Sequence, residues 1–309
     1  MSVRLAVSMG IGLVVAVLCA SFLVGVRFGR REEPEPGEAL PPGVPGRLLL
    51  VNGRRVHVVE RGEGAPLLLV HGTGGTTFDW ESSVLDAFAR SHRVIAIDLF
   101  GMGFSERSDG FRYGFEFWAD QLAGVLDALD IERAALIGQS LGGAIVTAFA
   151  GRYPDRALRV VSVDSGPWMP PFMLVLLTPG IGELYLARRP FWPERPDQPP
   201  AYAERMRAVY RIRGTRQNLL RLNRSQFLDA RAYLRWVRRA ACPVLLVHGR
   251  DDDIIPLRAA QSLQRSLAGS ELVVLEGAGH FAMQDQPERF VAVVEPFLRG
   301  DAKAAASPP

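Results

Sequence analysis

The chain has 309 residues, of which 48% are hydrophobic and 22% charged, and its formal net charge is +3. This composition is ordinary for a globular protein that can bury a core, as one large domain with an insertion or as two domains. The two cysteines, Cys19 and Cys242, give no disulfide framework and no metal-ligand spacing. Although 35 of the 36 basic residues are arginine, no nucleic-acid-binding module accompanies them, so nucleic acid is excluded as a partner.

The N-terminal region predicts a transmembrane anchor within residues 1–31. Residues 5–26 are uncharged and mostly apolar, and 22 residues in a helix can cross about 30 Å of hydrocarbon. A cleaved signal peptide is the alternative, but its apolar core is usually about 7–15 residues long and ends in a small-residue cleavage site. Three arginines follow the apolar run and one precedes it, which favours a cytoplasmic catalytic part.

A proline-rich spacer is expected to follow the anchor. Residues 32–46 read EEPEPGEALPPGVPG, and five prolines in this stretch favour a semi-extended chain without helix or strand. At the other end of the chain, residues 300–309 read as a disordered tail. The globular part is therefore predicted to span residues 47–299.

Within that part, strands and helices are expected to alternate. The first two strands, 47–51 and 54–60, flank Asn52-Gly53, which is a strong hairpin signal. The later strands are predicted at 67–70, 94–97, 134–137, 158–163, 244–247 and 272–275. The helices are predicted near 82–89, 115–129, 141–152, 257–267 and 287–298. Such alternation indicates an α/β fold with a mostly parallel sheet, helices on both faces, and a ligand site at the carboxyl ends of the strands.

A candidate nucleophile lies between a strand and a helix. Residues 138–143 read GQSLGG, the G-x-S-x-G pattern of a sharp turn that exposes a serine, here Ser140. Side chains at positions 138 and 142 would clash in such a turn, which explains the glycines. The N–H of Leu141 is expected to point toward an oxyanion, where the helix N-terminus adds partial positive charge.

A serine hydroxyl needs a general base, and the candidate is His280. His280 follows the last strand in a glycine-rich loop, GAGHF, and it is the last histidine, as the chain order serine, acid, histidine requires. The other histidines lie in a hairpin strand, in loops or beside the acid loop. From the residues alone the acid is open among Asp251, Asp252, Asp253 and Asp164, each of which follows a strand.

The loop after the strand at 67–70 is the candidate oxyanion hole. It reads HGTGG at 71–75, and its small residues let a backbone N–H approach the reacting oxygen. Thr73 is the first choice for this donor and Gly74 the second, together with Leu141. A phosphate-binding loop is the rival interpretation, but no G-K-[ST] follows.

With these motifs in order, residues 47–299 resemble the α/β-hydrolase superfamily, in its esterase, lipase and C–C hydrolase branch. The resemblance rests on HGTGG (71–75), DLFGMGFS (98–105), GQSLGG (138–143), GRDDDIIP (249–256) and GAGHFAMQDQPE (277–288). The family's acid loop, G-x-x-D-x-x-x-P, selects Asp252, and the resemblance implies that Asp98 is structural. It also makes 167–240 an inserted helical cap that selects substrate.

The resemblance also limits the reaction. Haloalkane dehalogenases and epoxide hydrolases carry aspartate where Ser140 stands, so both are excluded. Ring-fission hydrolases often carry asparagine before the nucleophile, whereas this chain has Gln139, which places C–C hydrolysis in doubt.

The cap segment 167–240 combines charge with apolarity. It holds 14 arginines against five acidic residues, and it opens with the apolar run WMPPFMLVLL at 168–177. The arginines form either a solvated helical surface or a face for an acidic substrate or anionic lipid, and the apolar run either packs on the core or contacts an acyl chain or lipid.

Together these features predict a membrane-anchored serine hydrolase that cleaves a carboxylic ester, with a lipid-like or otherwise apolar acyl part, through an acyl-enzyme on Ser140. Alternatives on the same triad are C–C bond or amide hydrolysis and a cofactor-free perhydrolase activity. A ligand-binding protein without catalysis, or an interaction protein organised by its anchor and cap, is the alternative of another class. No cofactor, metal, nucleic acid or obligate protein partner is implied.

Overall fold

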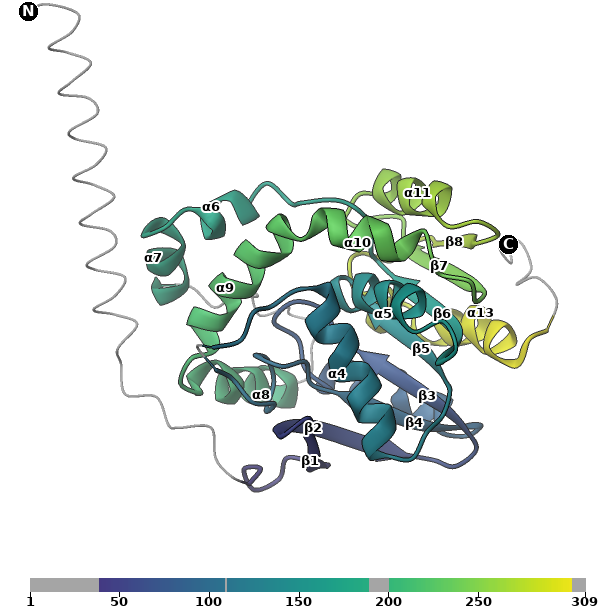
Figure 1. Cartoon of the computed structure of the whole chain (residues 1–309), viewed down its shortest axis with the longest axis horizontal. Helices are drawn as coiled ribbons and strands as arrows, with labels where there is room; N and C mark the ends of the chain where they lie inside the picture. Colours follow the sequence, from purple (N-terminus) through teal and green to yellow (C-terminus); the bar gives the residue numbers. More distant parts are fainter. Residues whose placement is uncertain (1–38, 109, 189–199, 302–309) are drawn as a thin grey trace, which may run out of the picture.

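The computed structural model describes residues 39–108, 110–188 and 200–301. These residues form a sheet of eight strands in the order β1-β2-β4-β3-β5-β6-β7-β8 (Figure 1). The strands are β1 (Arg47–Val51), β2 (Arg54–Arg61), β3 (Ala65–Val70), β4 (His92–Ile97), β5 (Ala134–Gln139), β6 (Ala157–Val163), β7 (Val244–Gly249) and β8 (Glu271–Leu275). Strands β3 to β8 are parallel to their neighbours among these six. Strand β1 pairs with β2, and β2 with β4, in antiparallel fashion.

The hairpin between β1 and β2 forms at the predicted dipeptide. Asn52 and Gly53 both have positive φ values, 51° and 75°, as a two-residue turn between right-twisted antiparallel strands requires. The hairpin extends the sheet beyond β4, because residues Val58 to Arg61 of β2 pair with β4. The predicted mostly parallel sheet is confirmed, with this hairpin as its antiparallel edge.

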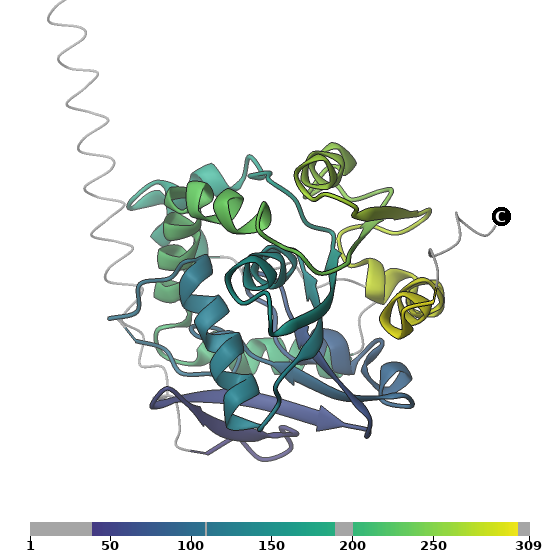
Figure 2. The same ribbon diagram turned by 45° about the vertical axis from the view of Figure 1, so that its right-hand side comes forward.

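Both faces of the sheet are covered, because the parallel strands are apolar on both sides. On β3, Leu68 and Val70 join a core cluster with helices α4 (Phe115–Ala128), α5 (Leu141–Arg152) and α11 (Leu257–Ser266). Leu67 and Leu69 join a second cluster with α3 (Leu85–Phe88) and α13 (Pro287–Arg299). Figure 2 shows α4 and α5 on one side of the sheet and α13, in yellow, on the other. The loops at the carboxyl ends of the strands therefore lie between two helical layers.

The core helices occur close to the predicted positions. They are α2 (Phe78–Glu81), α3 (Leu85–Phe88), α4 (Phe115–Ala128), α5 (Leu141–Arg152), α11 (Leu257–Ser266), α12 (Ala282–Asp285) and α13 (Pro287–Arg299). The helix predicted near 82–89 occurs as the short helix α3, and residues 82–84 separate it from α2, which was not predicted. Residues 76 and 77 connect α2 to the candidate oxyanion loop, 71–75.

Between β6 and β7 the chain forms the helical insertion that was predicted as a cap. Its described helices are α6 (Met173–Leu177), α7 (Ile181–Arg188), α8 (Pro200–Arg211), α9 (Thr215–Leu228) and α10 (Ala230–Val237). Leu176, Leu186, Leu219 and Leu222 of these helices are buried in the same cluster as α4 and α5. The insertion thus packs on the core through a continuous apolar contact, on the side where α8 and α9 appear in Figure 1.

The predicted membrane anchor, residues 5–26, lies outside the described residues, as does most of the C-terminal tail. Among residues 39–108, 110–188 and 200–301, none of the helices combines the length and apolarity needed to cross a membrane. The described part of the spacer, 39–46, contains no helix or strand.

Candidate active site

Ser140 stands on a sharp turn between β5 and α5. Its φ and ψ are 52° and −115°, a conformation that residues with side chains rarely adopt and that costs about 1–3 kcal/mol. Two glycines make the turn possible: a Cβ at Gly138 would lie 2.2 Å from the carbonyl oxygen of Gly142, and a Cβ at Gly142 would lie 2.3 Å from that of Val70. The hydroxyl is thereby presented at the carboxyl edge of the sheet.

The structure brings His280 together with one of the four candidate acids. His280 Nδ1 lies 2.8 Å from Asp252 Oδ2, and the other oxygen of Asp252 accepts from the N–H groups of Ile254 (2.9 Å) and Ile255 (2.8 Å). Asp252 is buried, whereas its neighbours Asp251 and Asp253 are exposed. The pairing orients the imidazole so that Nε2 is the ring nitrogen that would take the serine proton.

Asp164, the fourth candidate acid, has a different place. Its two oxygens accept from the N–H groups of Gly249 (2.8 Å) and Ala282 (2.9 Å), so it braces the loops that carry Asp252 and His280. Burial raises the pKa of Asp164 to about 7; the charge of His280 opposes this rise and that of Asp252 adds to it.

A third buried group, His248, lies behind the acid. Its Nε2 donates to the carbonyl of Ile255 (2.8 Å) and lies 3.6 Å from Asp252 Oδ2. Burial lowers the pKa of His248, which favours the neutral ring. Ligand atoms of Asp164, His248 and Asp252 lie within 4.8 Å of one another, as a metal site would need. All four carboxylate oxygens already accept hydrogen bonds within the protein, so the cluster fits a bracing role.

Gln139, the residue before the nucleophile, was not predicted to have a role. Its Nε2 donates to the carbonyl oxygen of His280 at 2.7 Å. A Cβ at Gly72 would lie 2.2 Å from Gln139 Oε1, so the glycine of the oxyanion loop makes room for this amide. Gln139 thus connects the nucleophile strand, the oxyanion loop and the histidine loop. Its position beside Ser140 is the one feature of the sequence that could have indicated this role.

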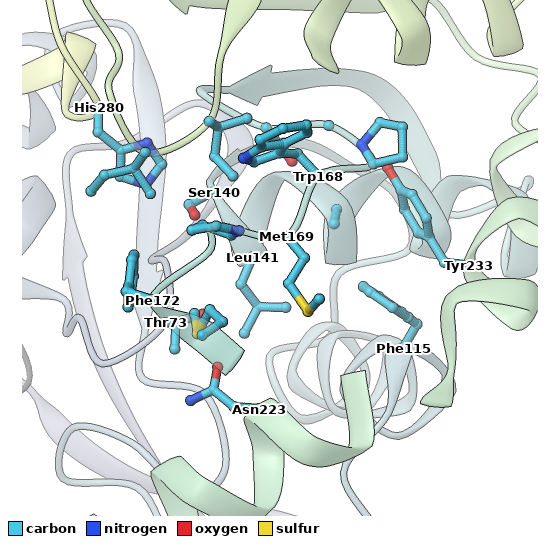
Figure 3. Close-up of a pocket in the computed structure, with 18 of the residues that line it drawn as sticks. Thr73, Phe115, Ser140, Leu141, Trp168, Met169, Phe172, Asn223, Tyr233 and His280 are labelled. Carbon is cyan, nitrogen blue, oxygen red and sulfur yellow. The ribbon is translucent and has the colours of Figure 1, made fainter. Parts of the chain in front are cut away.

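The two candidate oxyanion donors lie near Ser140. Thr73 and Leu141 line the same cavity as Ser140 and His280, and Leu141 is the first residue of α5 (Figure 3). The N–H of Gly74 donates to Met102 Sδ at 3.1 Å, so this second-choice donor is engaged elsewhere. Thr73 lines the cavity, whereas Gly74 is not among the described lining residues, so Thr73 stays the first-choice donor.

Asp98 holds the far side of this loop, as expected for a structural residue. It is fully buried and accepts from His57 Nδ1 (2.8 Å) and from the N–H groups of Thr77 and Phe104 (both 2.7 Å). The second ring nitrogen of His57 donates to Pro45 O at 2.8 Å. Burial opposes both charges, but their mutual attraction outweighs it, raising the pKa of His57 and lowering that of Asp98.

Ser140 opens into a cavity of about 350 Å³ between core and cap. In Figure 3, Ser140 and His280 lie on one side of this cavity and Phe115 and Tyr233 on the other. Most of its lining is apolar, with Trp168, Met169 and Phe172 contributed by the start of the cap segment. Among the described lining residues there is no arginine, lysine, aspartate or glutamate.

This architecture has relatives among known proteins. Residues 67–293 match the sequence profile of the alpha/beta hydrolase family. The chain is 31% identical over 281 residues to 2-hydroxy-6-oxo-2,4-heptadienoate hydrolase of Pseudomonas putida, a match that covers 83% of this chain and 97% of that protein. It is 33% identical over 289 residues to 2-hydroxymuconate semialdehyde hydrolase of a Pseudomonas species, covering 84% of this chain and 96% of the relative.

A solved structure of a meta-cleavage product hydrolase from Pseudomonas fluorescens superposes with a TM-score of 0.69 at 26% identity, over 82% of this chain and 98% of that one. The profile match covers most of the globular part and includes Ser140, Asp252 and His280. The chain belongs to the α/β-hydrolase family.

Proposed function

We propose that this hydrolase cleaves uncharged carboxylic esters with an apolar acyl part, through an acyl-enzyme on Ser140. The observation that carries the proposal is the joint lining of one apolar cavity by Ser140, His280, Thr73 and Leu141. A nucleophile, a base oriented by Asp252 and two flanking backbone donors are the groups that acyl transfer needs.

Each step follows from this placement. Ser140 Oγ attacks the ester carbonyl carbon while its proton passes to His280 Nε2, and the carbonyl oxygen becomes an oxyanion held by the N–H groups of Thr73 and Leu141. The C–O bond to the alcohol then breaks, and His280 returns the proton to the departing alkoxide. Water repeats the sequence on the acyl-enzyme and releases the acid, with Asp252 stabilising the imidazolium each time.

The apolar lining of the cavity supports an uncharged substrate. A carboxylate that enters an apolar cavity loses its hydration, and no cation among the described lining residues replaces it. A cavity of about 350 Å³ is at the small end of the range typical for small-molecule sites. We therefore expect neutral acyl groups of short or medium length to be preferred.

Carbon–carbon bond hydrolysis is the second candidate, and the relatives support it better than they support ester cleavage. Both named relatives are hydrolases of oxo-dienoates or of a muconate semialdehyde, and the solved neighbour is a meta-cleavage product hydrolase. The same serine could attack a ketone if the carbon leaving group were stabilised as an enolate. Such substrates carry a carboxylate, which the described lining does not pair.

A direct comparison of the two substrate classes tests the proposal. The purified full chain would be given p-nitrophenyl esters of graded acyl length, an ester whose acyl chain ends in a carboxylate, and a 2-hydroxy-6-oxo-dienoate. We expect the neutral esters to have kcat/KM values at least about tenfold above both carboxylates, because an unpaired buried charge costs more than 1.4 kcal/mol. Faster cleavage of the dienoate would instead establish the second candidate.

Covalent labelling identifies the nucleophile independently of substrate choice. A fluorophosphonate should label the wild type but not Ser140→Ala, and labelling should be strongly reduced in His280→Ala. Ser165→Ala is the matched control, because Ser165 also lines the cavity and its loss should leave the label in place. A folded wild type that neither labels nor turns over would contradict serine catalysis and favour a ligand-binding role.

A further inference from the structure

The cap helix α8 lies against the loop that carries the oxyanion donor Thr73. Tyr202, Arg205 and Tyr210 of α8 all contact residues between 74 and 81. Arg205 and Tyr210 follow Tyr202 by three and eight residues, which places both on the side of the helix that carries Tyr202. These contacts are polar and directional, and all three are made to the segment that follows Thr73.

Tyr202 reaches the carboxylate that shapes the loop. Its hydroxyl donates to Asp79 Oδ1 at 2.6 Å, and Asp79 Oδ2 accepts from the N–H of Thr76 at 3.1 Å. Both Tyr202 and Asp79 are buried, with 7% and 1% exposure. A Cβ at Gly75 would lie 2.1 Å from Asp79 Oδ2, so the carboxylate packs directly on the loop backbone. Tyr202 therefore fixes the position of the carboxylate that fixes residues 75 and 76.

Tyr210 reaches the loop backbone itself. Its hydroxyl donates to the carbonyl oxygen of Gly74 at 3.2 Å. That carbonyl belongs to the residue directly after Thr73, and the N–H of Gly74 is held by Met102 Sδ. Burial, with the nearby charge of Asp79, raises the pKa of Tyr210, so the hydroxyl keeps its proton and remains a donor.

A third contact joins the same two segments farther along. Arg205 donates to Glu81 Oε1 at 3.1 Å, and its guanidinium carbon lies 4.1 Å from the ring centroid of Phe78, which also stacks on Tyr202. The segment 74–81 is thus held from the core by Asp98, through Thr77, and from the cap by α8. Because Gly74 and Gly75 give this loop wide backbone freedom, it needs such external contacts to keep a single conformation.

We propose that α8 is part of the catalytic machinery: Tyr202 and Tyr210 are positioning residues that hold the oxyanion loop so that the Thr73 N–H meets the developing oxyanion. The inference rests on the proposed acyl-transfer function. The cap then has two tasks, since its first residues line the acyl cavity and its helix α8 aligns a transition-state donor. Movement of α8 away from the core would weaken catalysis even with the triad intact.

The expected kinetic effect is specific. An oxyanion donor acts on the transition state and not on the bound ester, so its displacement lowers kcat and leaves KM nearly unchanged. Complete loss of one donor costs about a hundredfold or more. Loss of one tyrosine hydroxyl should displace the donor without removing it. Because a misalignment of about 1 Å can cost a hundredfold in rate, we expect a smaller displacement to lower kcat by about five- to thirtyfold.

The test compares Tyr202→Phe and Tyr210→Phe with the matched control Tyr153→Phe. Tyr153 donates to Asp120 Oδ1 at 2.6 Å, the same distance as in the Tyr202–Asp79 pair, but it does not line the cavity. Each full-length variant would be assayed with p-nitrophenyl butanoate and with a butyl trifluoromethyl ketone. Ser140 adds to this ketone, its proton passes to His280, and the ketone oxygen becomes an oxyanion in the same hole. Thermal unfolding of each variant would be measured in parallel.

We expect kcat to fall by five- to thirtyfold in the two α8 variants with KM within twofold, and the inhibition constant of the ketone to rise by the same factor. The control should stay within twofold in all three constants. Adding Asp79→Asn to Tyr202→Phe should lower kcat little further, because the asparagine keeps an oxygen that can accept from the Thr76 N–H and the bond to Tyr202 is already lost. A kcat at the control level, or a change in KM alone, would overturn the inference. A wild type without turnover would instead contradict the proposed function.

Discussion

Among the residues that line the cavity, Tyr233 has a buried hydroxyl for which the described part of the chain offers no hydrogen-bond partner. Its ring packs on Phe115 with centroids 4.8 Å apart, and burial raises the pKa of its hydroxyl. A buried donor without a partner destabilises a protein by roughly 1–3 kcal/mol.

Tyr233→Phe should therefore raise the free energy of unfolding, by about 1 kcal/mol, because it removes the hydroxyl and keeps the ring. Urea unfolding of the variant beside wild type measures the difference. The matched control is Tyr153→Phe, which loses a hydrogen bond to Asp120 and should be destabilised. A loss of stability in Tyr233→Phe would mean that the hydroxyl is satisfied in solution.

Asp164 gives a pH dependence whose sign can be worked out. Burial raises the pKa of Asp164 to about 7 in the folded chain, whereas an unfolded aspartate titrates near about 3.9. Between about pH 4 and pH 7 the folded state therefore binds more protons than the unfolded state. The contribution of this group to stability is fully present below about pH 4 and is lost as the pH rises to about 7, with a slope of at most about 1.4 kcal/mol per pH unit.

In Asp164→Asn this slope should disappear, because the amide does not ionise. The variant loses an acceptor for one of the two N–H groups of Gly249 and Ala282, so its overall stability falls, but more evenly across pH. Urea unfolding at four pH values between 5 and 8 distinguishes the pH dependence of stability from the overall loss of stability. Asp127→Asn, at an exposed position, is the control and should keep the wild-type slope. Equal slopes in wild type and Asp164→Asn would disprove the assignment.

On the scale of elements, helix α4 receives its N-terminal cap from the inserted segment. Gly114 at the N-cap position has no side chain, and Asp229, from between α9 and α10, accepts from the N–H of Phe115 at 2.8 Å. A Cβ at Gly114 would lie 2.8 Å from the same carboxylate oxygen, so the glycine makes room for it. The cap residue is 114 positions away from the helix it stabilises.

Asp229→Ala should lower the free energy of unfolding by about 1 kcal/mol, the usual value of an N-cap hydrogen bond. Asp229→Asn keeps an oxygen acceptor at the same place and should lose less than half as much. Chemical denaturation of the three proteins gives the comparison. If Asn and Ala were equally destabilised, the negative charge at the helix N-terminus, and not the hydrogen bond, would be responsible.

The elements themselves could largely be predicted from the sequence, because apolar strands such as 67–70 and 134–137 and the Asn52-Gly53 turn are local signals. Helix α2 at 78–81 could not, because Asp79 and Glu81 there are held by tertiary contacts with α8. The same limit applies to the site. Ser140 and His280 stand in glycine-rich motifs, whereas the contacts of Gln139, Tyr202 and Tyr210 join segments more than 120 residues apart. The choice of Asp252 over Asp164 needed either a family pattern or the folded structure.

Over the whole molecule, cap and core share one interior. Leucines of α6, α7 and α9 are buried in the cluster that contains α4 and α5, and Arg107 of the core donates to Thr215 at the start of α9 at 3.0 Å. The contacts of α8 and Asp229 add to this junction. The cap segment carries +9 and the remainder of the chain −6 in formal charge, which adds a mutual attraction at low salt.

We therefore expect the described part of the chain to unfold as one cooperative unit. Differential scanning calorimetry of the full chain should show a single transition whose calorimetric and van't Hoff enthalpies agree. Tryptophan fluorescence, which includes Trp80 and Trp118 in the core and Trp168 and Trp236 in the cap, and the far-ultraviolet circular dichroism signal should change together in urea. An early transition that removed activity before the sheet unfolded would show that the cap is a separate unit.

The backbone of Ser140 has a consequence for how this chain can be improved. Its φ of 52° suits glycine, so Ser140→Gly should relieve strain and raise the melting temperature while abolishing turnover. Thermal stability thus favours glycine at position 140, whereas catalysis requires serine there. Laboratory evolution that rewards survival of heating without an activity assay would enrich inactive proteins at codon 140, and any stabilised library should be sequenced there first.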